Sequence, residues 1–81
     1  MGGYFYLMKD QKKLLIKCLK DEIPAFVICG TDICSVRTME QYYEYAKEAG
    51  CNEDFLEDLL LYIEDFKQFQ KEEPEKIKLP D

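Results

Sequence analysis

The sequence predicts a mainly α domain: a compact three-helix fold with one short, buried extended or β segment at residues 25–29. Apolar residues recur at helical spacing in three separate stretches, and proline or glycine follows each of them. With 81 residues, 47% hydrophobic and 35% charged, the chain suits one globular domain rather than a disordered segment. We expect a single helical domain over residues 9–73.

The first helix is expected from Lys9 to Asp21, after a flexible or weakly paired lead-in at residues 1–8. One side of this helix is apolar, with Leu14, Leu15, Cys18 and Leu19 at helical spacing. Lysines gather on the other side, at positions 9, 12, 13, 17 and 20. Pro24 ends the helix because the residue before a proline is pushed toward extended geometry.

Residues 25–29 form a continuous apolar run, Ala-Phe-Val-Ile-Cys, that ends at Gly30. The short length and the β-branched and aromatic members favour a buried strand or extended segment. A strand needs partners for its backbone donors and acceptors. We expect residues 4–7, Tyr-Phe-Tyr-Leu, to supply them, or else pairing across a dimer interface.

The second helix has several candidate N-caps, since Thr31, Asp32, Ser35 and Thr38 all carry side-chain oxygens. Val36, Met39, Tyr43 and Ala46 then keep helical spacing, and Tyr42, Tyr45 and Ala49 form a second strip beside them. Gly50 is expected to end this helix in the left-handed conformation.

Asn52 is the expected N-cap of the third helix, which runs to about Glu73 and stops at Pro74. Because only Gly50 to Asn52 separates the second and third helices, these two helices must be neighbours. Residues 74–81 are expected to form an extended tail that docks through Ile77 and Leu79.

Charge is unevenly distributed along the chain, whose net charge is −6. Residues 1–37 carry six basic and four acidic side chains, and residues 38–81 carry five basic and thirteen acidic ones. Phosphate contacts need a basic face, so nucleic acid is an unexpected partner. The lysines of the first helix still leave three ligands open: RNA, an acidic protein, or the acidic third helix of the same or a neighbouring molecule. The acidic third helix also disfavours a DNA-binding helix-turn-helix.

No apolar run is long enough to span a bilayer, so no membrane partner is expected. Four cysteines without an export signal indicate a reducing compartment, and we expect a cytoplasmic protein.

Catalysis, cofactors and metals are not expected. The chain has no histidine, which removes the commonest general base. Among the cysteines only Cys29 and Cys34 approach the spacing of a metal knuckle. An alternative is a thiol redox or reactive-cysteine protein, because Cys34 lies near the start of the second helix, where thiolates are favoured, with Cys29 as its partner.

Leu61 stands out on the third helix because it falls among Asp54, Glu57, Asp58 and Asp65. The sequence therefore predicts a non-catalytic protein-interaction or assembly module, homodimeric, with acidic second and third helices. Amphipathic aromatics are enriched at interfaces, so the interface candidates are Tyr42, Tyr45, Leu61, Tyr62 and Phe69. A second alternative is an acidic decoy that occupies a basic nucleic-acid-binding protein through Glu57, Asp58, Glu64 and Asp65.

The segment FVICGTDICS, the tyrosine-rich helix ending in AGC, the FKQF motif and the KLPD end together resemble small bacterial and prophage-type proteins of unassigned activity. The resemblance covers roughly residues 24–81. It implies a shared compact fold and assigns no functional residue.

Overall fold

Three α-helices and one 3₁₀ turn follow one another along the chain: α1 (Gly3–Lys20), α2 (Ser35–Ala49), α3 (Glu53–Glu72) and η1 (Pro74–Lys76). The computed structural model describes the backbone of residues 3–80 and the side chains of residues 11–80. Within that range the only sheet-like pairing is one isolated parallel bridge between Asp32 and Lys78. The prediction of a mainly α fold with three helices is therefore confirmed.

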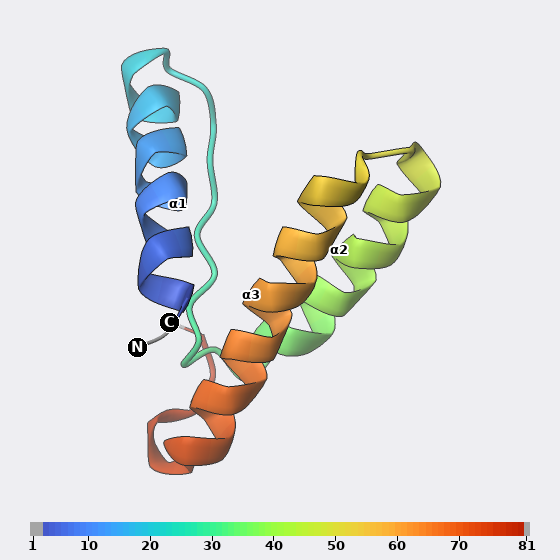
Figure 1. Ribbon diagram of the computed structural model, residues 1–81. Helices are drawn as coiled ribbons and strands as arrows, with labels where there is room; N and C mark the ends of the chain where they lie inside the picture. Colours follow the sequence, from blue (N-terminus) through green and yellow to red (C-terminus); the bar gives the residue numbers. More distant parts are fainter. Residues whose placement is uncertain (1–2, 81) are drawn as a thin grey trace.

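The helices α2 and α3 form an antiparallel hairpin because two caps lie side by side between them (Figure 1). Gly50 has φ +86°, and its N–H and that of Cys51 donate to the last carbonyls of α2, each at 3.1 Å. The Asn52 side chain then accepts the Phe55 N–H at 2.9 Å and begins α3. The sequence predicted this turn correctly.

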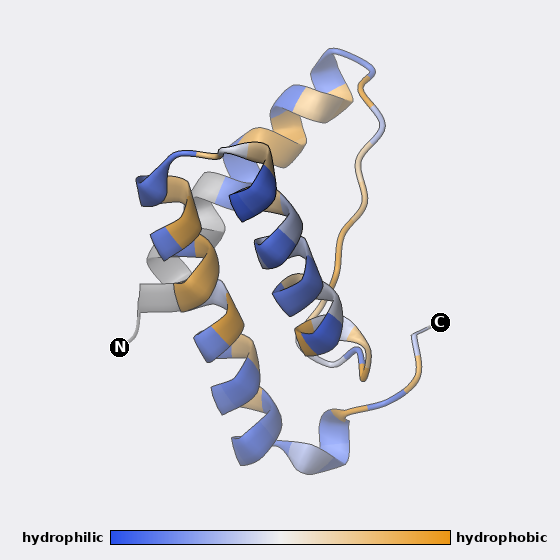
Figure 2. Ribbon diagram, turned by 90° about the vertical axis from the view of Figure 1, so that its right-hand side faces the viewer, coloured by the Kyte–Doolittle hydropathy of each residue, from blue (hydrophilic) through white to orange (hydrophobic). Residues whose placement is uncertain are grey.

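The core is small and lies along the seam between α2 and α3. Among the described residues, only Ala46, Leu59 and Ile63 are buried hydrophobic side chains. In Figure 2 one side of α2 is strongly hydrophilic, whereas α3 carries hydrophobic residues along much of its length. The apolar stripe of α3 is therefore wider than α2 alone covers.

The loop before α2 is tied to α3 by a buried polar cluster. Ser35 is fully buried, and its Oγ donates to the Asp32 carbonyl at 2.7 Å. The side-chain amide of Gln70 donates to the Gly30 carbonyl (3.0 Å), the Asp32 carbonyl (3.2 Å) and Ser35 Oγ (3.1 Å). Gln70 thus holds the start of α2 against the end of α3.

The C-terminal tail docks on the same loop. The Lys78 N–H donates to the Thr31 carbonyl at 2.9 Å, and the Lys78 carbonyl accepts the Ile33 N–H at 3.0 Å. Ile77 is half-buried, but Leu79 is 73% exposed. The tail is therefore held by Ile77 and by the backbone of Lys78, and the expectation that Leu79 docks it is wrong.

The predicted start of the first helix is also wrong. The helix α1 begins at Gly3 rather than Lys9, so residues 4–7 are helical and form no strand with residues 25–29. Residues 1–8 were expected to be a flexible or weakly paired lead-in, but from Gly3 onward they form the beginning of α1. Residues 1–2 and 81 lie outside the described part of the chain.

Residues 25–29 are extended, but they are neither a β-strand nor buried. Phe26 is 87% and Val27 62% exposed, and Ile28 alone among the five is half-buried. The segment turns back from the far end of α1 toward the start of α2 (Figure 1). The prediction of a buried strand failed because its expected partner is helical, which leaves the segment without a partner strand among the described residues.

Candidate interaction surfaces

The chain exposes more surface than its mass requires. Its accessible area is 6776 Å², whereas folded monomers of 9.6 kDa typically expose about 5,100 Å². Its radius of gyration is 13.4 Å, compared with about 12 Å for a compact domain of 81 residues. The excess comes from an open arrangement in which α1 contacts α3 but its C-terminal end projects away from the α2–α3 hairpin (Figure 1).

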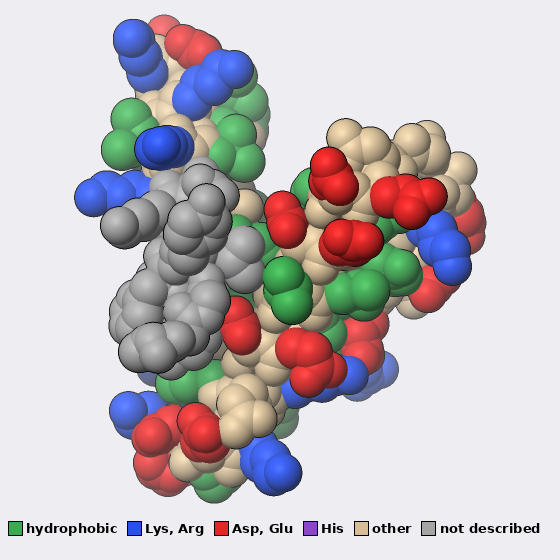
Figure 3. Space-filling model, viewed as in Figure 1, with side chains coloured by type: hydrophobic (Ala, Val, Ile, Leu, Met, Phe, Trp, Pro, Cys, Tyr) green, Lys and Arg blue, Asp and Glu red, His purple; other side chains and the backbone are tan. Residues whose placement is uncertain are grey.

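Residues 11–29, here called the arm, comprise the second half of α1 and the extended segment after it. Figure 3 shows lysine and hydrophobic side chains together at the projecting end of α1. Burial of large apolar side chains is the main favourable term in association, so the arm is a candidate interface. Its exposed large hydrophobic side chains are Leu14, Leu15, Ile16, Leu19, Ile23, Phe26 and Val27.

Ile16 has a distinctive position on the arm. It is 52% exposed, and on a helix its surface neighbours lie three and four positions away. Three of these neighbours are lysines, at positions 12, 13 and 20, and the fourth is Leu19. An aliphatic side chain is therefore surrounded by positive charge on an exposed face.

Leu61 has a corresponding position on α3, but the charged side chains around it are negative instead of positive. It is 54% exposed, and its neighbours one turn away are all acidic: Glu57, Asp58, Glu64 and Asp65. Figure 3 shows hydrophobic side chains set among acidic ones over the hairpin. The structure thus brings together the predicted acidic residues and Leu61 on one helix.

No cation of the described chain neutralises this acidic set. The ion pairs among the described residues are Lys67–Glu40 (3.1 Å) and Lys76–Glu73 (3.4 Å). Partial burial, and then the neighbouring Glu64 carboxylate, raise the pKa of Asp65 above the usual aspartate value. The negative charge of Asp65 is therefore destabilised by its own surroundings in the chain.

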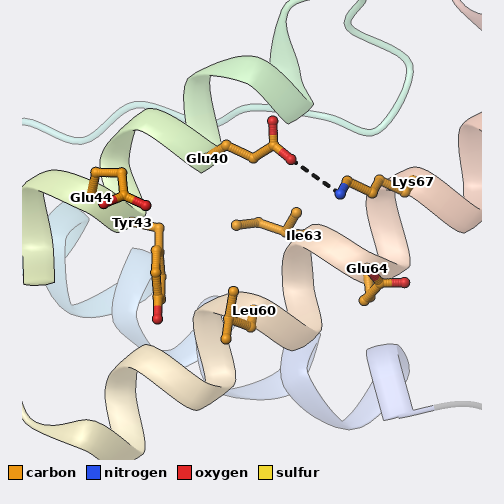
Figure 4. Close-up of a pocket in the computed structure, with 7 residues that line it drawn as sticks. All are labelled: Glu40, Tyr43, Glu44, Leu60, Ile63, Glu64 and Lys67. Carbon is orange, nitrogen blue, oxygen red and sulfur yellow. Dashed lines mark ion pairs between the residues drawn. The ribbon is translucent and has the colours of Figure 1, made fainter.

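A shallow groove follows one side of the α2–α3 seam, with Tyr43 and Leu60 in its middle. Its two halves have volumes of about 480 and 410 Å³. Figure 4 shows Leu60 and Ile63 of α3 opposite Tyr43 of α2, with the Glu40–Lys67 ion pair across one end. Glu44, Glu57 and Glu64 also line the groove, so its rim is mainly acidic and suits basic side chains.

The five predicted interface residues differ in exposure and in surroundings. Tyr42 and Tyr45 are exposed on α2, and Tyr42 meets Phe55 edge to face, with ring centroids 6.4 Å apart and planes at 86°. Tyr62 and Phe69 are half-buried, and Phe69 lies against the Gly30 backbone, where an added Cβ would be 3.2 Å from Cδ2. Leu61 is exposed and has carboxylates one turn away on either side.

The two predicted thiols, Cys29 and Cys34, are both exposed and free. Cys34 is the N-cap residue of α2, and its backbone N–H donates to Asp32 Oδ1 at 2.7 Å. No cluster of three or more potential metal ligands of the Cys, His, Asp or Glu type occurs in the described part of the chain. These residues therefore offer no metal site, and the thiol alternative stays a prediction.

The sequence did not lead us to two residues that the structure brings to attention, Gln70 and Ile16. Gln70 carries no sequence signal, because its partners lie 35 to 40 residues away. Ile16 does carry one: it is an aliphatic residue among like charges, the pattern that identified Leu61.

Within residues 3–80, no helix combines the length and the apolar character that crossing a bilayer requires. Comparison with protein-family models, curated proteins and solved structures finds no match to this chain. The resemblance to small bacterial and prophage-type proteins stays a prediction.

Proposed function

We propose that this chain is a non-catalytic protein-interaction module that assembles as a homodimer. The observation that supports the proposal is the excess of exposed surface, together with the large hydrophobic side chains that lie on it. The chain exposes 6776 Å², which is about 1,700 Å² more than a typical folded monomer of its mass. One partner in a standard protein–protein interface buries about 800 Å², so covering a single interface would account for half of the excess.

The exposed side chains are of the kind that drives association. Full burial of one large aliphatic or aromatic side chain contributes about 1.5–3 kcal/mol. Association costs on the order of 4–15 kcal/mol in translational and rotational entropy. The seven exposed hydrophobic side chains of the arm are 36% to 87% exposed, so covering all of them would contribute about 6–12 kcal/mol. This contribution is of the same order as the cost of association.

Self-association would also add to the stability that the small hydrophobic core provides. Among the side chains that the structure describes, three buried hydrophobic ones form a modest core, and at this size a single core rarely supplies more than about 3–5 kcal/mol. A second copy that binds only the folded chain raises the free energy of unfolding by mass action. We infer that folding and assembly are coupled in this protein.

Sedimentation velocity over a wide range of concentration tests the proposal. We expect a species of about 19 kDa, twice the 9.6 kDa of the chain, together with a midpoint of chemical denaturation that rises with protein concentration. A strict monomer at the highest concentration, with a midpoint independent of concentration, would contradict the homodimer.

A further inference from the structure

Two exposed aliphatic side chains occupy matching surroundings of opposite charge. Ile16 on α1 has lysines at three of its four neighbouring surface positions, and Leu61 on α3 has carboxylates at all four. Both side chains are more than half exposed, at 52% and 54%. A purely solvated helix face would carry a polar residue at each of these positions.

These two faces do not meet within one chain. If α1 lay on the Leu61 face of its own α3, both side chains would be buried and lysine–carboxylate pairs would form. Among the described residues, no ion pair joins α1 to α3. The complementarity is therefore left for a second molecule.

We propose that the Ile16 face of α1 in one copy packs on the Leu61 face of α3 in a second copy. This contact rests on the proposed homodimer and specifies how its two chains meet. Ile16 and Leu61 form an apolar centre, while Lys12, Lys13 and Lys20 surround it and face Glu57, Asp58, Glu64 and Asp65. In a two-fold dimer the same contact occurs twice, because each copy offers both faces.

The chemistry of the contact has two parts. A central apolar pair shielded from water by a surrounding ring is the arrangement that concentrates binding energy at protein interfaces. Charges of opposite sign in the ring add specificity and speed the encounter. Packed helices approach to about 8–10 Å between their axes, a distance at which a lysine side chain readily reaches a carboxylate on the partner helix.

The raised pKa of Asp65 is consistent with this pairing. In the single chain its carboxylate is partly buried and lies next to Glu64, so a cation from a partner helix would relieve an existing repulsion. A basic helix of another protein would fit the same face, but this chain already carries a matching one. We therefore assign the position to a second copy.

Reciprocal charge reversal tests the contact. One variant reverses the lysine ring (K12E, K13E and K20E), and a second reverses the carboxylates around Leu61 (E57K, D58K and E64K). A control reverses three exposed carboxylates that lie outside the groove and the Leu61 face (E48K, E72K and E75K) and changes the net charge by the same amount as the second variant. Circular dichroism verifies that each variant keeps its helix content, and sedimentation velocity then gives the mass.

We expect each reversed variant to be at least tenfold weaker in self-association than the native chain, because like charges then face one another. The control should dimerise like the native chain. An equimolar mixture of the two reversed variants should restore the dimer, since both contacts of the mixed pair then join opposite charges. This restoration is the result that a merely structural effect of the substitutions would not produce.

Each other outcome has a definite meaning. If the native chain and both variants dimerise equally well, the homodimer stands and this contact is wrong. If both variants are weakened and their mixture does not recover, the Ile16 and Leu61 faces do not pair with each other and the contact is also wrong. If the native chain is monomeric throughout, the proposed function itself fails, and with it the contact.

Discussion

The side-chain amide nitrogen of Gln70 lies 3.1 Å from Ser35 Oγ, on a serine with no exposed surface. The same amide reaches the carbonyls of Gly30 and Asp32. Two amide hydrogens are thus shared among three acceptors, which fixes the loop on which the C-terminal tail also pairs. This cluster joins three segments that are far apart in the sequence.

Replacing Gln70 with alanine should lower the free energy of unfolding by about 1–3 kcal/mol, because buried acceptors lose their donor. Chemical denaturation at a fixed protein concentration measures the change. Gln68 provides a matched control, since its amide donates to Glu72 Oε2 on the exposed side of the same helix. Gln68→Ala should change the free energy of unfolding by less than about 0.5 kcal/mol. An equal loss of stability in both variants would show that the hydrogen bonds of Gln70 stabilise the fold no more than an exposed hydrogen bond does.

Gly50 ends α2 with φ +86°, and an added Cβ would meet nothing within 4 Å. The substitution Gly50→Ala therefore tests backbone conformation alone. It should lower the free energy of unfolding by about 1–2 kcal/mol, because an alanine is strained in the left-handed region. Gly50→Asn should cost clearly less, since asparagine tolerates this conformation. Equal costs for alanine and asparagine, measured by thermal denaturation, would argue against the strain.

The edge-to-face contact of Tyr42 with Phe55 joins the exposed sides of α2 and α3. A double-mutant cycle with Tyr42→Ala and Phe55→Ala should give a coupling energy of about 0.5–1 kcal/mol. Additive effects of the two substitutions would mean that the rings do not stabilise the hairpin. In that case Tyr42 could bind a partner without the loss of an interaction that stabilises the hairpin.

The raised pKa of Asp65 predicts a pH dependence of stability with a definite sign. The folded state takes up the proton more readily than the unfolded state, so Asp65 lowers stability as pH rises from the unfolded value, about 3.9, through the folded value. Above that window its cost is constant. Asp65→Asn should therefore stabilise the separated chain at neutral pH and lose this advantage below the unfolded pKa.

Denaturation of the native chain and of Asp65→Asn across this pH range measures the difference. Asp58→Asn removes one charge from the same face of α3 and controls for the general effect of net charge. If the two variants follow the same pH profile, the environment of Asp65 has no particular effect on stability.

The sequence was most informative where local chemistry decides the structure. Gly50 and Asn52 predicted the turn between α2 and α3, and Pro74 predicted where α3 ends, because caps and prolines act within one helical turn. The start of α1 was missed because residues 4–7 are aromatic and aliphatic, and such side chains suit a helix or a strand. Their choice depends on what they pack against.

Exposure was harder to predict than helix position. Phe26 and Val27 were expected in the core because they are apolar and adjacent, yet they are among the most exposed large hydrophobic side chains of the described residues. Burial depends on contacts made far away in the sequence, or on a second molecule. Leu61 was the exception, since four acidic neighbours on its own helix mark an exposed position without any knowledge of the fold.

The most direct measurement of how two copies meet is an isotope-filtered NOE experiment on native protein, in which ¹³C-labelled and unlabelled chains are mixed. It records only contacts between different molecules. The homodimer described here predicts intermolecular NOEs between the methyl groups of Ile16 and Leu61. Spectra of a dimer in which these methyl groups contact other residues, or spectra with no intermolecular NOE at a concentration where sedimentation shows a dimer, would contradict it.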